Sequence, residues 1–374
     1  MRVKDRGVIF DCATAAPDEK SCAFTSLIRL ANGDLLVGFR LGSGRDAPDG
    51  RVRLMRSRDG GRSWQILHAG LTHTIDGIDG NFYSGHFTEL EPGHLLGAFC
   101  WVDRSDPNKS FVNPETTGLA PTRNLIAESF DGGETWGPYR EVDCSPDTGC
   151  TVTGPVVKLA GALAYPYESW KEYDDDSWGV HSAHFRISTD GGLTWPEDAV
   201  AATSDGVDIF YWDQRDATHP ETGEIAIMYW THDRTRQTDI ENHIQFGSPD
   251  GRTWSTPIST GGRGQHCQPI ALGGDRLGAV YVHRHDPPSI KFMISDDFGR
   301  TWDRDNELTI FDSREGTESG HDTDERGFED FWQDMMAWRF GHPRGVVLPD
   351  GDLFFAWYGG STEASTMEWA LVGE

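Results

Sequence analysis

One short turn occurs five times along the chain, and this repetition constrains the fold more than any other feature. The copies are SRDGGRSW (57–64), SFDGGETW (129–136), STDGGLTW (188–195), SPDGRTW (248–254) and SDDFGRTW (295–302). In each copy the Asp carboxylate can accept bonds from backbone N–H groups of its own turn, and the glycines permit positive φ. We therefore expect these turns to be structural, with each closing Trp packed between neighbouring sheets.

A second repeat precedes the first and consists of a Gly-bearing turn followed by an apolar strand. Its six copies are NGDLLVGFR (32–40), PGHLLGAFCW (92–101), AGALAYPYESW (160–170), TGEIAIMYW (222–230), GGDRLGAVYVHR (273–284) and PDGDLFFAWY (349–358). Short runs of β-formers bounded by Gly, Asn, Asp and Pro indicate strands, and helical windows are almost absent apart from 329–340.

Repeating all-β units of about 50–70 residues are typical of propellers with four strands per blade. The sequence therefore predicts an all-β fold, a six-bladed β-propeller with four-stranded antiparallel blades, forming a single domain over residues 1–374. The last blade lacks an Asp turn, and residues 7–12 (GVIFDC) are well placed to supply its outermost strand. That pairing would close the ring and remove its edge strands.

Charge and composition exclude several classes of partner. The chain has 33 basic and 60 acidic residues, a net charge of -27, which disfavours nucleic acid and anionic membrane surfaces. No apolar run approaches the roughly 20 residues of a membrane helix. The N-terminus has no signal-peptide h-region, so a cytoplasmic location is expected as written, with secretion or a periplasmic location left open. The six cysteines form no CxxC pair. Free buried thiols are expected, with a Cys144–Cys150 bridge as the alternative.

Strand order predicts which face carries function. The first two strands of each blade form a hairpin around the Gly turn, so the start of the first and the end of the second share a face. The Asp turns then lie on the opposite face. The long crossovers between blades return to the first face, and binding and catalytic residues concentrate on such loops.

The residues predicted to meet on that face combine carboxylates, imidazoles, guanidinium groups and indoles. Aromatic rings suit sugar faces, paired carboxylates suit glycosidic cleavage, and Arg binds carboxylates in a bidentate manner. We therefore expect a carbohydrate partner. The residues are Arg40, Asp46, His86, Trp101, Glu168, Trp212, Asp213, Trp230, His266, Gln268, His283, Arg284, His342, Arg344 and Tyr358, with Glu329, Asp330, Trp332 and Gln333 in the last crossover.

The repeated turns resemble the Asp-boxes, or BNR repeats, of the sialidase superfamily, whose members form six-bladed propellers. The resemblance covers nearly the whole chain. The stretch GFRLGSGRDAP (38–48) is similar to the one that holds a substrate-binding Arg and the acid/base Asp, which implies those roles for Arg40 and Asp46. Ala23, in CAFT (22–25), stands where the superfamily places its first carboxylate-binding Arg. Strict sialidase activity is therefore not expected.

Three functions follow as hypotheses. The first is a sialidase-like glycoside hydrolase that acts in the exo mode on a terminal, possibly acidic, sugar. Its catalytic residues would be Asp46, Glu168 and Tyr358, with substrate bound by Arg40, Arg284 and the tryptophans. The second is a β-propeller lyase that acts on uronate-containing glycans with a His or Tyr base, and the third is a non-catalytic glycan-binding propeller. No cofactor is expected, and a metal at an axial cluster of His86, His266, His283 and His342 is the alternative.

Overall fold

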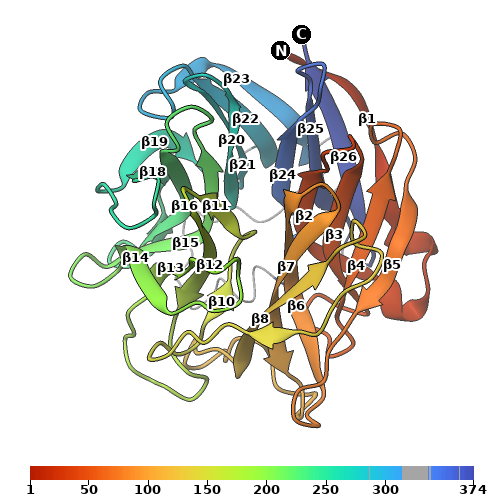
Figure 1. Cartoon of the computed structure of the whole chain (residues 1–374), viewed down its shortest axis with the longest axis vertical. Helices are drawn as coiled ribbons and strands as arrows, with labels where there is room; N and C mark the ends of the chain where they lie inside the picture. The colour runs from red at the N-terminus through yellow and green to blue at the C-terminus, as the bar shows by residue number, and fades with distance from the viewer. Residues whose placement is uncertain (286, 314–335, 337, 362) are drawn as a thin grey trace.

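The computed structural model describes residues 1–285, 287–313, 336, 338–361 and 363–374. Six β-sheets are arranged around a central axis, each with its inner strand at the axis and its outer strand at the rim (Figure 1). The predicted six-bladed, all-β propeller is confirmed. The helical elements described outside the last crossover are two short 3-10 turns, η1 (Cys12–Thr14) and η2 (Pro17–Glu19).

The strands of the first three blades follow one another in chain order from the axis outward. The first blade holds β2 (Ser21–Arg29), β3 (Leu35–Gly42), β4 (Arg51–Ser57) and β5 (Gln65–Leu71). The second holds β6 (Gly80–Glu91), β7 (His94–Asp103), β8 (Thr122–Ser129) and β9 (Arg140–Glu141). In the third, the inner strand is split into β10 (Thr151–Val152) and β11 (Val157–Leu159), followed by β12 (Ala162–Ser169), β13 (Ser182–Ser188) and β14 (Glu197–Thr203).

The remaining blades repeat this order. The fourth holds β15 (Ile209–Thr218), β16 (Ile225–Asp233), the short β17 (Thr238–Asp239), β18 (Glu241–Gly247) and β19 (Ile258–Arg263). The fifth holds β20 (Cys267–Gly273), β21 (Arg276–His283), β22 (Ser289–Ser295) and β23 (Asp303–Asp312). The sixth holds β24 (Gly341–Val347), β25 (Leu353–Gly360), β26 (Ser365–Gly373) and, outermost, β1 (Arg2–Asp11).

The two ends of the chain meet in this sixth blade. Strand β1 pairs antiparallel with β26, with Gly7 opposite Trp369, and the N- and C-termini lie together at the top of Figure 1. Lys4 Nζ also lies 2.8 Å from Asp352 Oδ1. The ring of sheets is thus completed by a strand from the opposite end of the sequence.

The core lies between adjacent blades rather than inside any one of them. Tyr165 and Trp195 of the third blade pack in one buried cluster with Leu96 and Ile126 of the second. The second strand of a blade is covered on both faces, and every residue of β3 is buried accordingly. Strands in this position therefore read as nearly continuous apolar runs in the sequence.

The repeated turns have the hydrogen bonds that their sequence predicts. The Asp59 carboxylate accepts from Ser57 Oγ (2.8 Å), Ser63 N (2.9 Å) and Ser63 Oγ (2.6 Å). Bonds from Ser63 and Ser57 lower the pKa of Asp59 to about 2. Equivalent bonds surround Asp131, Asp190 and Asp297.

The Asp turns lie beside the hairpin turns, on the face predicted for them. Gly132 donates its N–H to the Gly93 carbonyl (2.9 Å), and Phe298 donates to the Asp275 carbonyl (2.6 Å). The other face of the propeller therefore carries the crossovers between blades and the loops that follow the second strands.

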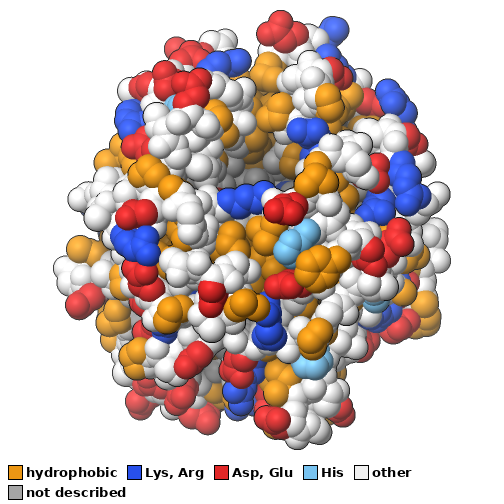
Figure 2. Space-filling model, viewed as in Figure 1, with side chains coloured by type: hydrophobic (Ala, Val, Ile, Leu, Met, Phe, Trp, Pro, Cys, Tyr) orange, Lys and Arg blue, Asp and Glu red, His pale blue; other side chains and the backbone are white. Residues whose placement is uncertain are grey.

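Other properties of the described residues bear on the sequence analysis. All six cysteines are free and buried, including Cys144 and Cys150. None of the described helical segments combines the length and hydropathy that crossing a bilayer requires. The face drawn in Figure 2 is hollowed near its centre and carries many acidic side chains, in keeping with the net charge of -27.

Candidate active site

A cavity of about 210 Å³ lies where the inner strands of several blades converge. Its carboxylates are Glu168 and Asp213, and its guanidinium groups are Arg215 and Arg344. Four imidazoles from different blades, His86, His181, His266 and His342, also line it. The cavity therefore combines acid, base and cationic groups within a wall that is otherwise mostly apolar.

Irregularities in the inner strands direct side chains into this cavity. Strands β2, β15 and β24 each have a register shift, and within these shifts Phe24, Asp213 and His342 have φ values of 53°, 53° and 48°. Non-glycine residues with positive φ are uncommon, and bulges of this kind turn a side chain away from the regular alternation of a strand. All three residues line the cavity.

A continuous polar chain crosses the cavity wall. Arg215 Nη2 lies 3.2 Å from Asp213 Oδ1, and Asp213 Oδ2 lies 2.8 Å from His266 Nε2. Burial alone would raise the pKa of Asp213, but its contact with His266 and the charge of Arg215 outweigh burial and hold that pKa well below its usual range. Asp213 is therefore ionised at neutral pH.

The chain continues from His266 to His342, whose Nε2 atoms lie 2.6 Å apart. Burial lowers the pKa of both imidazoles, and for His266 it outweighs the opposing effect of Asp213. Burial lowers the pKa of His86 as well. In the neutral pair, one proton on His266 Nε2 serves both Asp213 and the lone pair of His342.

Glu168 is held next to Asp213 by the backbone of the neighbouring blade. Gln214 donates its N–H to Glu168 Oε1 (3.2 Å), and its side-chain amide donates to the Tyr167 and His184 carbonyls (2.9 Å each). His181 Nε2 lies 3.3 Å from Glu168 Oε2. The residue that follows Asp213 in sequence thus fixes the second carboxylate.

Arg215 and Arg344 place two positive charges near each other. Arg344 donates Nε–H to the Thr25 carbonyl (2.9 Å), and Arg215 donates to the Gln214 carbonyl (2.8 Å). Burial lowers the pKa of Arg344, and the charge of Arg215 lowers it further. An anionic ligand group between the two guanidiniums would relieve this repulsion and accept bidentate bonds.

Aromatic rings form much of the remaining wall. Trp212 and Trp230 lie 4.8 Å apart with planes inclined at 61°. On the other side Tyr83 stacks on Phe111, with ring centroids 4.0 Å apart, and contacts Phe24 at 4.6 Å. Such surfaces suit the C–H faces of a sugar ring.

The comparisons with known proteins concern the fold. No family model matches the sequence, and no curated protein matches it. A protein of unknown function from Dyadobacter fermentans DSM 18053 superimposes with a TM-score of 0.71 at 18% identity, over 99% of this chain and 98% of that one. The intramolecular trans-sialidase of Ruminococcus gnavus gives a TM-score of 0.63 at 11% identity, over 100% and 98% of the two chains. The chain has a sialidase-like six-bladed propeller fold.

A third solved structure of similar fold belongs to an enzyme with a different activity. The α-L-arabinanase of Penicillium chrysogenum, complexed with arabinobiose, has a TM-score of 0.63 at 16% identity, over 100% of this chain and 98% of that one. At such identities the likeness shows the architecture alone. The chemistry of this sialidase-like propeller must be argued from its own residues.

The structure brings only part of the predicted set to the cavity. The predicted residues that line it are His86, Glu168, Trp212, Asp213, Trp230, His266, His342 and Arg344. Those outside its lining are Arg40, Asp46, Trp101, Gln268, His283, Arg284 and Tyr358. Glu329, Asp330, Trp332 and Gln333 fall outside the described residues.

Arg40 and Asp46 hold loops behind the cavity wall. Arg40 donates to the carbonyls of Gly44 (2.9 Å) and Ala47 (2.5 Å), and burial lowers its pKa to about 10. Asp46 forms an ion pair with Arg104 and accepts from the Phe111 N–H (2.8 Å). Through Phe111, Asp46 positions one aromatic residue of the cavity.

The other predicted residues outside the lining also have defined contacts. Arg284 donates to Gln265 Oε1 (2.9 Å) and to the Phe340 carbonyl (2.8 Å). The Arg45 guanidinium lies 4.5 Å from the buried ring of Tyr358. Trp101 Nε1 donates to the His73 carbonyl (2.8 Å), and Gln268 Oε1 accepts from the Gly345 N–H (2.9 Å). The His283 ring lies against the His285 ring, with centroids 5.1 Å apart.

Sequence reasoning missed Arg215, Phe111 and Trp170 as cavity residues. Arg215 lies two residues after Asp213, so strand alternation places the two on the same face. The bulge that directs both into the cavity leaves no sign in the sequence WDQR (212–215). Phe111 belongs to the long loop between β7 and β8, and no local pattern shows where such a loop folds back.

Proposed function

We propose that this propeller is a glycoside hydrolase that removes a terminal acidic sugar, with Asp213 and Glu168 as its reacting carboxylates. The observation that carries the proposal is the convergence of these two carboxylates with Arg215 and Arg344 on one small cavity. Asp213, held ionised, stabilises the oxocarbenium-like transition state, and Glu168 protonates the leaving oxygen as the glycosidic C–O bond breaks. Water then adds to the anomeric carbon, and its released proton returns to Glu168.

The cavity favours a single sugar residue at the chain end. Its volume of about 210 Å³ is below the roughly 300–1,000 Å³ of pockets that enclose drug-sized ligands. Arg215 and Arg344 supply two guanidiniums for a substrate carboxylate, although Ala23 leaves the first-blade position of the sialidase pattern without one. Two proteins of similar fold, an α-L-arabinanase complexed with arabinobiose and an intramolecular trans-sialidase, support a carbohydrate as the substrate class.

The sequence-based roles of Arg40, Asp46, Arg284 and Tyr358 stay predictions. In the described structure these residues stand behind the cavity lining, so we assign them positioning roles. Trp212 and Trp230 remain the proposed sugar platforms because both line the cavity.

A second candidate is a lyase acting on uronate-containing glycans. The neutral His266–His342 pair favours it, because a neutral imidazole can abstract a proton beside a uronate whose carboxylate is bound by Arg215 and Arg344. The two reactions leave different products. Elimination forms a new C=C bond that absorbs in the near ultraviolet, whereas hydrolysis does not.

The test is a screen of acidic and neutral chromogenic glycosides and uronate polysaccharides, with Asp213→Asn and Glu168→Gln beside the wild type. We expect sugar release without new absorbance, and a loss of about 10²–10⁴-fold in kcat for either variant. Asp296→Asn is the control, since that carboxylate is 87% exposed and lies outside the cavity lining. New absorbance would favour the lyase, and binding without product would favour a non-catalytic propeller.

A further inference from the structure

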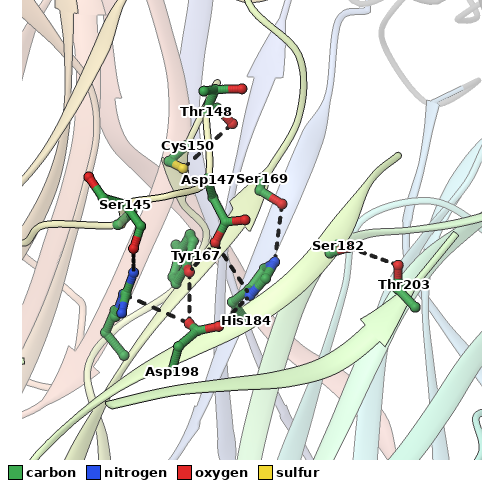
Figure 3. Close-up of polar contacts among 12 residues, drawn as sticks. Ser145, Asp147, Thr148, Cys150, Tyr167, Ser169, Ser182, His184, Asp198 and Thr203 are labelled. Carbon is green, nitrogen blue, oxygen red and sulfur yellow. Dashed lines mark hydrogen bonds and ion pairs between the residues drawn. The ribbon is translucent and has the colours of Figure 1, made fainter. Parts of the chain in front are cut away.

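A second cluster of ligating side chains lies on the third blade, against the crossover that leads into it (Figure 3). It consists of Asp147, His184 and Asp198, each offering one ligand atom, and these atoms lie within 4.8 Å of one another. His184 comes from β13 and Asp198 from β14, while Asp147 comes from the crossover between β9 and β10. Residues far apart in the sequence therefore converge on one point.

The two carboxylates of this cluster share few hydrogen-bond donors. Tyr167 Oη lies 2.9 Å from Asp147 Oδ2 and 2.7 Å from Asp198 Oδ1, so its single proton serves two acceptors. His184 Nδ1 lies 3.1 Å from Asp198 Oδ2 and 3.9 Å from Asp147 Oδ2. Arg186 Nε is 3.8 Å from Asp198 Oδ1, and its Nη2 donates to the Ser145 carbonyl.

The imidazole of His184 is oriented by its other neighbours. Its Nε2 lies 3.1 Å from Ser169 Oγ, and its ring stacks on Tyr167 with centroids 4.7 Å apart. Metal-binding histidines are commonly fixed in this way, with the non-ligating nitrogen bonded to a second group. Nδ1 is thereby directed towards both carboxylates.

The contacts of Ser169, His184 and Asp198 also resemble a hydrolytic triad, but access argues against that function. Ser169 is only 7% exposed and lines neither described cavity. By contrast, the side chains of Asp147 and Asp198 are 26% and 28% exposed. Asp147 also borders an outer cavity of about 720 Å³. A small ion can therefore reach a point that a substrate carbonyl cannot reach next to Ser169.

We propose that Asp147, His184 and Asp198 form a binding site for a divalent first-row metal ion such as Mn²⁺. Two carboxylate oxygens and one neutral imidazole nitrogen form a ligand set of mixed hardness that suits such ions. The ion takes the place of the proton between His184 Nδ1 and Asp198, and Nε2–H then donates to Ser169. This inference is independent of the proposed glycosidase.

The bound ion would fasten the blade-two crossover to the third blade. That crossover continues from Asp147 into Thr151, Val152 and Thr153, which line the axial cavity. The site thus lies where a cation would hold one wall of the cavity in place without touching a substrate.

The test is a titration of the full chain with Mn²⁺, following the electron paramagnetic resonance signal of the free ion. We expect one site per chain, with affinity reduced by at least roughly 10–100-fold in Asp198→Asn and in His184→Gln, because loss of a group that merely orients a ligand already costs that much. Asp275→Asn is the control, because Asp275 pairs with His219 (3.0 Å) and belongs to no convergent set among the described residues. Mn²⁺ is also a suitable probe because the nearby thiols of Cys144 and Cys150 prefer softer ions and should bind it weakly.

Two results would overturn the site: no stoichiometric Mn²⁺ binding by the wild type, or undiminished binding by both variants. Circular dichroism and unfolding temperature, measured in chelator, show whether each variant is folded. If His184→Gln does not fold, Asp198→Asn decides the question, because its side chain is partly exposed. Binding that Asp275→Asn weakens as much as Asp198→Asn would likewise contradict the assignment.

Discussion

The Nε2 atoms of His266 and His342 lie 2.6 Å apart, and His266 Nε2 also lies 2.8 Å from Asp213 Oδ2. These three residues come from three different blades, so the contact exists only in the closed ring. Because burial favours neutral imidazoles while Asp213 stays ionised, the chain joins one anionic carboxylate to two neutral imidazoles. Such a chain can orient a carboxylate for hydrolysis or provide a base for elimination.

We expect protein stability to fall as the pH drops through the ordinary His value, and His342→Gln to weaken this dependence. The folded state lowers the pKa of His342 below 6.5. The unfolded chain therefore binds the proton first, and the free energy of unfolding falls by up to about 1.4 kcal/mol per pH unit for this one group. Urea denaturation between pH 5 and 7.5 measures the slope. An identical slope in the variant would refute the linkage.

Arg344→Met should weaken the binding of acidic substrates selectively. Loss of charge-assisted bonds worth about 1.5–3 kcal/mol corresponds to roughly 10–100-fold in kcat/KM. A neutral glycoside with the same leaving group is the control, and its kcat/KM should change little. If both substrates lose activity equally, Arg344 supports the cavity rather than recognising charge.

The Asp turns offer a matched pair of neighbours for a stability test. Asp297 accepts from Ser295 Oγ and from the Thr301 N–H and Oγ, all at 2.7 Å. The Asp296 side chain is 87% exposed, and its Oδ1 lies 3.4 Å from Arg276 Nε. Asp297→Ala should therefore lower the unfolding temperature, and Asp296→Ala should leave it nearly unchanged.

The stability difference between Asp297→Ala and Asp296→Ala should decrease as the pH falls. Burial raises the pKa of Asp297, but hydrogen bonds from Thr301 and Ser295 outweigh burial and lower that pKa below 3.8. The stabilisation is thus present above about pH 4 and is lost in stronger acid. Differential scanning calorimetry at pH 7 and pH 3 should show the gap between the two variants narrowing. A gap that is constant with pH would indicate that the carboxylate charge is unimportant.

Asp46→Asn separates a positioning role from an acid/base role. Because Asp46 holds Arg104 and the Phe111 N–H, we expect the substitution to cost about 1.5–3 kcal/mol of stability while activity below the unfolding temperature falls less than tenfold. Activity lost by 10²-fold or more from a protein of unchanged stability would instead support the acid/base prediction. Chemical denaturation and initial rates on the same sample distinguish the two.

The fold was predictable because its signals are local and repeated. Each Asp turn carries its own hydrogen-bond partners within a few residues, and each Gly turn marks a hairpin. The candidate site was predictable where residues end regular strands: Glu168 lies near the end of β12 and lines the cavity as expected.

Prediction was weaker where loops or bulges decide direction. Arg40 was placed on the right face, yet its guanidinium turns back onto the Gly44 and Ala47 carbonyls of the loop that follows β3. Arg215 was missed because the assignment used the residues at the start of each inner strand, whereas Arg215 lies beyond the bulge in β15. Neither effect changes the spacing of apolar residues in the sequence, so neither can be read from that pattern.

The pairing of β1 with β26 has a consequence for biosynthesis. On the ribosome, residues 2–11 are made well before the strand they pair with, residues 365–373, which follows more than 350 residues later. Until that strand is made, the nascent sheets form an open arc with an unpaired strand at one end. Such an edge invites association with other chains. We therefore expect the speed of elongation and the presence of chaperones to change the yield of folded protein, while the stability of the finished fold stays the same.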